Sequence, residues 1–167
     1  FWSGRKNAFP ASGRLSPDYY CIDGTIPRKK VGAMLREIER MEGFYNLRCI
    51  NVFHAGDGNL HPLILFDSSE PGEFEKTEKF GEEILDLCVK FGGTITGEHG
   101  VGLEKLGSMC VQFSENERNT FSAVKFAFDK NNLFNPGKVI PVLSRCVEKG
   151  RKHVHKDNRE FKEIPSF

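Results

Sequence analysis

Apolar residues recur along this chain with the two spacings that distinguish strands from helices. The segments 47–53 and 62–66 are nearly continuous apolar runs rich in β-branched residues, and we expect both to form strands. Between residues 27 and 41 the apolar positions instead recur every three or four residues, which predicts a helix that begins near Pro27. Its expected core face comprises Val31, Met34, Leu35, Ile38 and Met41.

The same periodicity predicts a second helix after the second of these strands. It begins near Pro71, with one of the serines at 68–69 as its N-cap, and it stops at Gly92-Gly93. Short strands at 19–23 and 94–96 complete the order strand, helix, strand, strand, helix, strand. That order is typical of ferredoxin-like domains. We therefore expect an α+β fold, with an antiparallel sheet and both helices on one face.

Two more helices are expected in the last third of the chain. A short one begins at Leu103, and a longer one spans residues 115–131. Ser114 and Glu117 have the spacing of a capping box at the start of the longer helix. Its predicted apolar face consists of Phe121, Val124 and Phe128.

Length and composition predict a single domain. At 167 residues the chain is large enough to bury a core. We expect a loop or linker at 1–18, the domain itself at 19–141, and an irregular polar tail at 142–167. The chain begins at Phe1-Trp2 without a methionine, which suggests a piece of a longer protein.

Charge and cysteine usage narrow the class of protein. A formal net charge of +1 favours neither nucleic acid nor an anionic membrane as a partner. The five cysteines are scattered, odd in number and never spaced as C-x-x-C. This argues against a disulfide framework and a thiolate zinc site, and favours a reducing, cytoplasmic setting. No apolar run approaches the length of a membrane span, and no signal peptide is visible.

Candidate chemistry is concentrated in two glycine-rich segments. The first runs from His54 to His61, and the second is Gly97-Glu98-His99-Gly100-Val101-Gly102. Asp57-Gly58 signals a hairpin that would bring the first two histidines together. Imidazole and carboxylate are donors that a catalytic divalent metal prefers. In an extended backbone the adjacent glutamate and histidine would point apart, one toward a metal and the other toward a substrate.

Each of these segments alone has an ordinary structural explanation. Histidines can be solvated hairpin ends and glycines can be turn residues, so a short motif by itself is weak evidence. The presence of both segments in one chain favours a functional site. A further pair, His153 and His155, could share a face of an extended tail, but it has no acidic or cysteine partner nearby in sequence.

The chain resembles the C-terminal domain of FAD-linked oxidases, a family of flavoenzymes acting on D-2-hydroxy acids such as D-lactate, glycolate and D-2-hydroxyglutarate. The resemblance is carried by Trp2-Ser3-Gly4-Arg5-Lys6, by the two glycine-rich segments and by Asn135-Pro136-Gly137-Lys138. It covers essentially the whole chain, and the tail is most similar to members that act on glycolate. It implies that FAD is bound mainly by an absent N-terminal domain, without which the fragment should not turn over substrate.

The resemblance also implies a role for each candidate residue. A divalent metal, which could be zinc, manganese or iron, would be held by His54, His61 and Glu98. The general base would be His99, the substrate carboxylate would pair with Arg5, and Asn135 would approach the flavin ring. Some relatives have a lysine that contacts a longer diacid where this chain has Cys21, and this departure favours a small monocarboxylate such as glycolate or D-lactate.

The implied partners are a small 2-hydroxy acid, the chain's own N-terminal FAD domain and other oxidase subunits. Those subunits would place a cytoplasmic protein at the periphery of the inner membrane. Two other classes of function stay open. One is a metal-dependent hydrolase, in which the same ligands activate water and Glu98 or His99 is the base. The other is a non-catalytic, ferredoxin-like interaction module.

Overall fold

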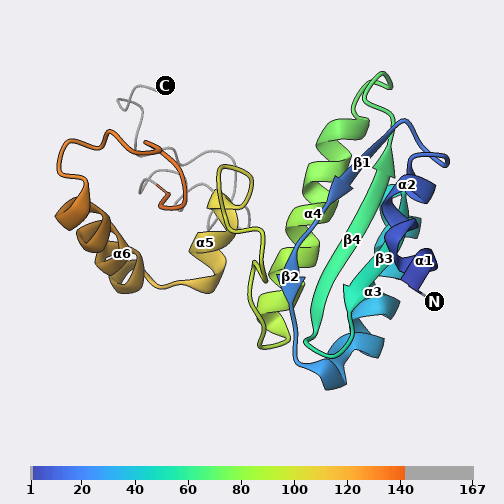
Figure 1. The fold of residues 1–167 in the computed structure, drawn as a ribbon, viewed down its shortest axis with the longest axis horizontal. Helices are drawn as coiled ribbons and strands as arrows, with labels where there is room; N and C mark the ends of the chain where they lie inside the picture. The colour runs from blue at the N-terminus through green and yellow to red at the C-terminus, as the bar shows by residue number, and fades with distance from the viewer. Residues whose placement is uncertain (1, 142–167) are drawn as a thin grey trace, which may run out of the picture.

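The structure, a computed structural model, describes residues 2–141. The tail expected at 142–167, with His153 and His155, lies outside the described residues, and its role stays a prediction. Figure 1 shows a sheet with two long helices packed on it, and beside it a smaller helical part formed by the last third of the described chain.

The sheet has four strands, and its middle strand is β4 (Asn59–Phe66), in which every residue is buried. One edge of β4 pairs with β3 (Arg48–His54), and the other edge pairs with β1 (Asp18–Cys21) and then β2 (Gly24–Thr25). All of these pairings are antiparallel. The two apolar runs of the sequence therefore form neighbouring strands, as predicted.

A proline explains why β1 and β2 are separate. The N–H of Ile22 donates to the carbonyl oxygen of Pro62 at 2.9 Å. Pro62 has no N–H, so it cannot donate the second hydrogen bond that a regular antiparallel pair would have here. The register continues across the interruption, since Cys21 lies opposite Leu63 and Gly24 lies opposite Leu60. The single strand expected at 19–23 is thus a longer strand with a gap in its hydrogen bonding.

The strand expected at 94–96 is reduced to an isolated bridge between Thr25 and Thr94. Two backbone hydrogen bonds, of 3.0 and 3.1 Å, join these residues, and their hydroxyl oxygens lie 2.6 Å apart. The pairing stops there because the N–H of Ile95 donates to the side-chain oxygen of Gln112 at 2.8 Å, and the N–H groups of 97–99 donate to Asp23. The α+β class is confirmed, with a sheet of four antiparallel strands.

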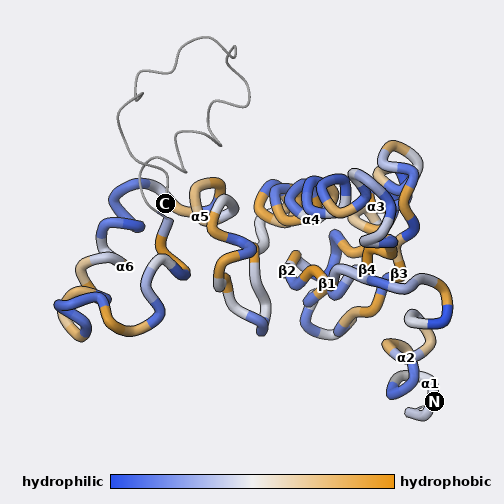
Figure 2. Tube along the Cα trace, turned by 90° about the horizontal axis from the view of Figure 1, so that it is seen from above, coloured by the Kyte–Doolittle hydropathy of each residue, from blue (hydrophilic) through white to orange (hydrophobic). Residues whose placement is uncertain are grey.

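Helices α3 (Val31–Tyr45) and α4 (Glu73–Lys90) cover one face of the sheet (Figure 2). Their inward positions follow the helical period and pack against the strand residues that face them. The most completely buried of these side chains include Ile22, Met34, Ile38, Ile64, Phe80, Ile84 and Cys88. The prediction that one of the serines 68–69 caps α4 is wrong. The hydroxyl of Ser69 donates to Asp67 instead, and the helix begins after Gly72.

Residues 2–12 form two short helices where the sequence predicted a loop, α1 (Trp2–Lys6) and α2 (Ala8–Ser12). Asn7 lies between them and its side-chain amide donates to the carbonyl oxygen of Ser3 at 2.8 Å. Pro10 is tolerated because it lies in the first turn of α2, where a backbone N–H has no partner within the helix. Helices of about one turn show no apolar periodicity, so the pattern did not reveal them.

The smaller part contains α5 (Leu106–Gln112) and α6 (Glu115–Phe128). The capping box at the start of α6 is confirmed: the hydroxyl of Ser114 accepts from the N–H of Glu117, and the Glu117 carboxylate accepts from the N–H of Ser114. None of the helices in residues 2–141 is long and apolar enough to cross a membrane.

The apolar face of α6 is not buried by the described residues. Phe128 is 86% exposed, and the ring of Phe121 meets that of Phe113 edge-on, at 5.1 Å between centroids. The helical period reports that a face is apolar, but it carries no information on which element covers that face.

The cysteines are not all thiols. Cys21, Cys49 and Cys88 are free, whereas Cys110 is disulfide-bonded, which the scattered spacing did not suggest.

Replacing Gly93 with alanine should lower the free energy of unfolding by roughly 1–3 kcal/mol, as for other overpacked sites. A Cβ at Gly93 would lie 1.8 Å from the backbone oxygen of Thr25, so one of the two segments must move. The matched control is Gly43→Ala in α3, where a Cβ meets open space and the helix should gain about 0.5–1 kcal/mol. Thermal unfolding followed by circular dichroism checks both. An unchanged melting temperature for Gly93→Ala would contradict this account.

Candidate metal centre

The hairpin between β3 and β4 brings two histidines to one face of the sheet. His54 ends β3 opposite Asn59, whereas His61 lies opposite Val52, two positions further along. Residues two apart share a face, and the rings of His54 and His61 meet edge-on at 5.3 Å between centroids. The histidines are diagonal neighbours, because residues 55–58 form a longer loop than the two-residue turn that Asp57-Gly58 suggested.

Glu98 and His99 reach the same place from the segment that follows α4. A carboxylate oxygen of Glu98 lies 2.7 Å from Nε2 of His61 and 3.4 Å from Nε2 of His54. The ring of His99 stacks on the ring of His61, with centroids 5.0 Å apart and an interplanar angle of 20°. His61 is therefore the centre of the group, and its side chain is only 7% exposed. The four residues singled out by the sequence are brought together.

Asp23, which is not among the candidate residues predicted from the sequence, sets the shape of this loop. The N–H groups of 97–99 all donate to one oxygen of its buried carboxylate, at 3.0, 3.1 and 2.9 Å, and the Thr96 hydroxyl donates to the same oxygen at 2.6 Å. Successive N–H groups around one anion form a nest, so the backbone is not extended here. For this reason the side chains of Glu98 and His99 both reach His61 instead of pointing apart.

Lys105 neutralises Asp23 from within the core. Its ammonium group donates to the backbone oxygen of Asp23 at 2.8 Å and lies 3.3 Å from the carboxylate, and both side chains are almost completely buried. Burial acts to raise the pKa of Asp23, but the hydrogen bonds from Thr96 and the loop, together with the charge of Lys105, hold that pKa well below its usual range. Asp23 is therefore an anion in the folded protein.

The sequence contains a weak signal for the buried pair of Asp23 and Lys105. Strand alternation places Tyr19, Cys21 and Asp23 on one face, and an aspartate at the end of an apolar strand needs a partner there. Lys105 stands between Glu104 and Leu106 in a segment read only as the start of a short helix. Nothing in the local pattern indicates that the two residues meet.

Three donors of this group could hold a metal ion. One ligand atom each from His54, His61 and Glu98 lies within 4.8 Å of the others. Two imidazoles and one carboxylate are a set that zinc, manganese and iron accept. Nδ1 of His61 is buried and has no hydrogen-bond partner among the described residues, and such a nitrogen is costly unless something binds it. The donor set therefore fits a divalent ion.

Cys21 supplies a further donor on the same face. Cys21 is in β1 and pairs with Leu63 of β4, which is two positions from His61 and therefore on the same face. The sulfur of Cys21 is within 4.8 Å of donor nitrogens of His61 and His99. Burial, reinforced by the nearby charge of Asp23, raises the pKa of the Cys21 thiol to about 11. No metal-ligand spacing in the sequence marks Cys21 as a donor, because its partners His61 and His99 are 40 or more positions away.

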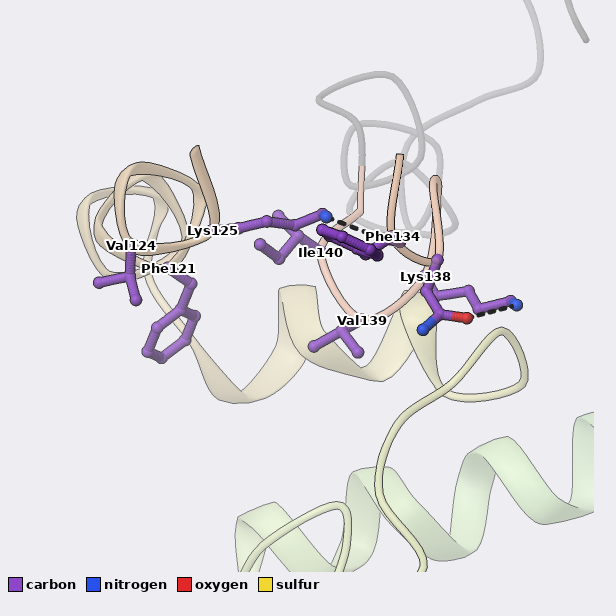
Figure 3. A pocket seen from close by; sticks show the side chains of 8 residues that line it. Phe121, Val124, Lys125, Phe134, Lys138, Val139 and Ile140 are labelled. Carbon is purple, nitrogen blue, oxygen red and sulfur yellow. Dashed lines mark hydrogen bonds between the residues drawn. The ribbon is translucent and has the colours of Figure 1, made fainter. Parts of the chain in front are cut away.

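The remaining two candidate residues lie outside the cluster. Arg5 is in α1, on the side of the sheet away from α3 and α4 (Figure 2). Asn135 follows α6, and its side-chain oxygen accepts a hydrogen bond from Lys138 at 3.1 Å. It lines a separate cavity of about 400 Å³, shown in Figure 3, with Phe121, Val124, Lys125, Phe134, Lys138, Val139 and Ile140. The roles of Arg5 and Asn135 stay predictions.

Comparison with known proteins defines the class. Residues 1–139 match the family described as FAD linked oxidases, C-terminal domain, and the chain belongs to this family.

Two relatives of this chain are much longer than the chain itself. It is 59% identical over all of its 167 residues to the glycolate oxidase subunit GlcD of Escherichia coli (strain K12), and covers 34% of that protein. It is 36% identical over 124 residues to the D-lactate dehydrogenase of Archaeoglobus fulgidus, with 73% of this chain and 27% of that protein covered. The chain thus spans about a third or less of the length of these relatives.

A solved structure supports the fold. The 4-ethylphenol oxidase from Gulosibacter chungangensis, in its isoeugenol complex, matches with a TM-score of 0.53 at 16% sequence identity. The match covers 74% of this chain and 24% of that one. At this level of identity the likeness concerns the fold alone.

Proposed function

We propose that this chain forms the substrate- and metal-binding part of a flavin-dependent 2-hydroxy-acid dehydrogenase or oxidase that acts on glycolate or D-lactate. The observation that carries the proposal is the convergence of His54, His61, Glu98 and His99 on one face of the sheet. The names of the two relatives support the substrates, and the family membership favours this function over a hydrolase or an interaction module.

His54, His61 and Glu98 would hold the divalent ion. When bound, the ion supplies Lewis-acid polarisation of the α-hydroxyl oxygen of the substrate, which makes its proton easier to remove. Two neutral imidazoles and one carboxylate leave a divalent ion with a net positive charge, as this role requires. The partly exposed side chains of His54 and Glu98 leave the centre accessible to a substrate.

His99 would accept the hydroxyl proton on its imidazole. Histidine is the side chain most often used for proton transfer near neutral pH. Its ring is stacked on His61, so it lies beside the ion position without contributing to the His54/His61/Glu98 set. Its backbone N–H is fixed by Asp23, which limits the freedom of the base. FAD, held mainly by the rest of the full-length protein, supplies the acceptor for the hydride of the α-carbon.

Substrate orientation would fall to Arg5, because the guanidinium fork binds a carboxylate through two parallel hydrogen bonds. Its helix lies on the side of the sheet away from α3 and α4 (Figure 2). The histidines face that side as well, because they alternate along their strands with the core residues Phe53 and Leu60. Beside the histidines lies the thiol of Cys21, which offers no positive charge to a second carboxylate and so supports a monocarboxylic substrate.

Asn135 would approach the flavin, as the resemblance to the family implies. The word subunit in the name of one relative supports an assembly with other oxidase subunits.

The proposal includes a ferredoxin-like arrangement of the sheet. Both long helices lie on one face, and β1 and β2 share one register along β4. The bridge between Thr25 and Thr94 would be the remnant of the last strand of that arrangement.

Elemental analysis of the purified chain tests the metal centre. We expect about one equivalent of zinc, manganese or iron per chain, as in other protein sites with three such ligands. The His54→Ala/His61→Ala variant should lose it, since even residues that only support a ligand contribute about 10–100-fold in affinity. Asp57→Asn is the matched control, because this carboxylate lies in the same hairpin but outside the donor set. Full retention of the metal by the double variant would refute the assignment.

A further inference from the structure

We propose that the centre contains a second, inhibitory metal position, formed by Cys21, His61 and His99, which takes a thiophilic ion. One ligand atom from each of these residues lies within 4.8 Å of the other two. The binding itself is independent of the function proposed above. Only the inhibition rests on that function, because it requires His99 to be the base.

The three donors are held in place by the fold. Cys21 and His61 lie on one face of adjacent strands, in register through the pairing of Cys21 with Leu63. His99 is stacked on His61 by a loop that Asp23 anchors. Because folding already orders these side chains, metal binding causes little further loss of conformational entropy.

A second observation points to a ligand at this place. His61 is 5% exposed, and its Nδ1 has no hydrogen-bond partner within residues 2–141. Buried polar atoms in proteins are almost always paired, so a lone nitrogen among other donors is typical of a binding position.

The chemistry of the set differs from that of the first position. One sulfur and two imidazoles favour soft or borderline ions such as zinc and cadmium, whereas a carboxylate with two imidazoles also suits manganese and iron. The binding step balances without a redox partner. The S–H bond of Cys21 breaks, a sulfur–metal bond forms, and the proton leaves to solvent.

Occupation of this position would stop the proposed reaction in two ways. His61 belongs to both donor sets, so a thiophilic ion bound to its ring displaces or repels the ion of the first position. The same ion occupies His99 and removes it as a proton acceptor. Cadmium, or zinc in excess, should therefore inhibit an enzyme that needs one metal ion for activity.

Titration of the 167-residue chain with cobalt(II) tests the proposal. A thiolate–cobalt bond gives a near-ultraviolet charge-transfer band, which we expect in the wild type. Cys21→Ser should lack this band and should bind cadmium at least about tenfold more weakly, since loss of a mere supporting residue already costs about 10–100-fold. Cys49→Ser is the matched control, because this free, half-buried thiol packs toward the helices on the other face. It should keep the band.

The outcomes separate the two proposals. Absence of the charge-transfer band in the wild type at saturating cobalt, or its persistence in Cys21→Ser, overturns the second position. If His54→Ala leaves the cobalt stoichiometry and the band unchanged, the second position stands and the first one fails. In the full-length protein, the inhibition by cadmium is measured as a fraction of each variant's own rate without cadmium. Cys21→Ser should relieve this inhibition, and Cys49→Ser should retain it.

Discussion

Replacing His99 with alanine in the full-length protein should lower kcat for glycolate or D-lactate by about 10²–10⁴-fold, the usual contribution of a positioned general base. The reason is that His99 contacts the centre through ring stacking on His61 and stands apart from the His54/His61/Glu98 donor set. Alanine removes the proton acceptor and leaves those donors in place. The rate of flavin reduction after anaerobic mixing with substrate measures the effect directly.

Two controls make the result specific to the base. The metal content of His99→Ala should equal that of the wild type, which excludes loss of the ion as the cause. Added imidazole should restore part of the rate, because the deleted ring leaves a space beside His61 that a small base can enter. A flavin reduction rate close to that of the wild type, with the metal retained, would refute the assignment of His99.

Replacing Asp23 with asparagine should destabilise the chain by about 3–5 kcal/mol, the cost of leaving one partner of a buried ion pair alone. The variant leaves the ammonium group of Lys105 buried without its counter-charge, and it turns an acceptor of four hydrogen bonds into a partial donor. For a chain of this size each kcal/mol corresponds to roughly 2–4 °C in Tm. Thermal unfolding with and without metal measures the loss.

The double variant Asp23→Asn/Lys105→Met separates stability from positioning. Methionine removes the stranded charge, so part of the lost Tm should return. Metal binding should not return, because the N–H groups of residues 97–99 still lack their carboxylate and the loop no longer presents Glu98 to the histidines. Recovery of metal binding together with stability would show that Asp23 has no role in positioning.

The part of the centre that the sequence predicted depends on local patterns. Strand alternation and a short hairpin place His54 near His61, and both signals lie within eight residues of chain. Asp23 could not be found in this way, because its hydrogen bonds join it to N–H groups that are 74 to 76 positions away. Periodicity in one segment carries no information on a contact of that separation.

The errors in the predicted fold have the same origin. The strand expected at 94–96 ends after one bridge because the N–H of Ile95 donates to the side chain of Gln112, and the N–H groups of 97–99 donate to Asp23. The apolar stripe of α6 correctly predicted a helix, but the described residues do not include an element that covers the stripe. In both cases the element was visible in the sequence and its partner was not.

Lys105 has a second connection that follows from its place in the chain. It is the N-cap residue of α5, so the ammonium group that neutralises Asp23 is also the point where the helical part of the molecule begins. The two parts seen in Figure 1 are therefore joined by a buried charge pair as well as by the backbone. A force on α5 would pull on the carboxylate that holds the loop of His99, so the helical part is mechanically coupled to the histidine that we propose as the base.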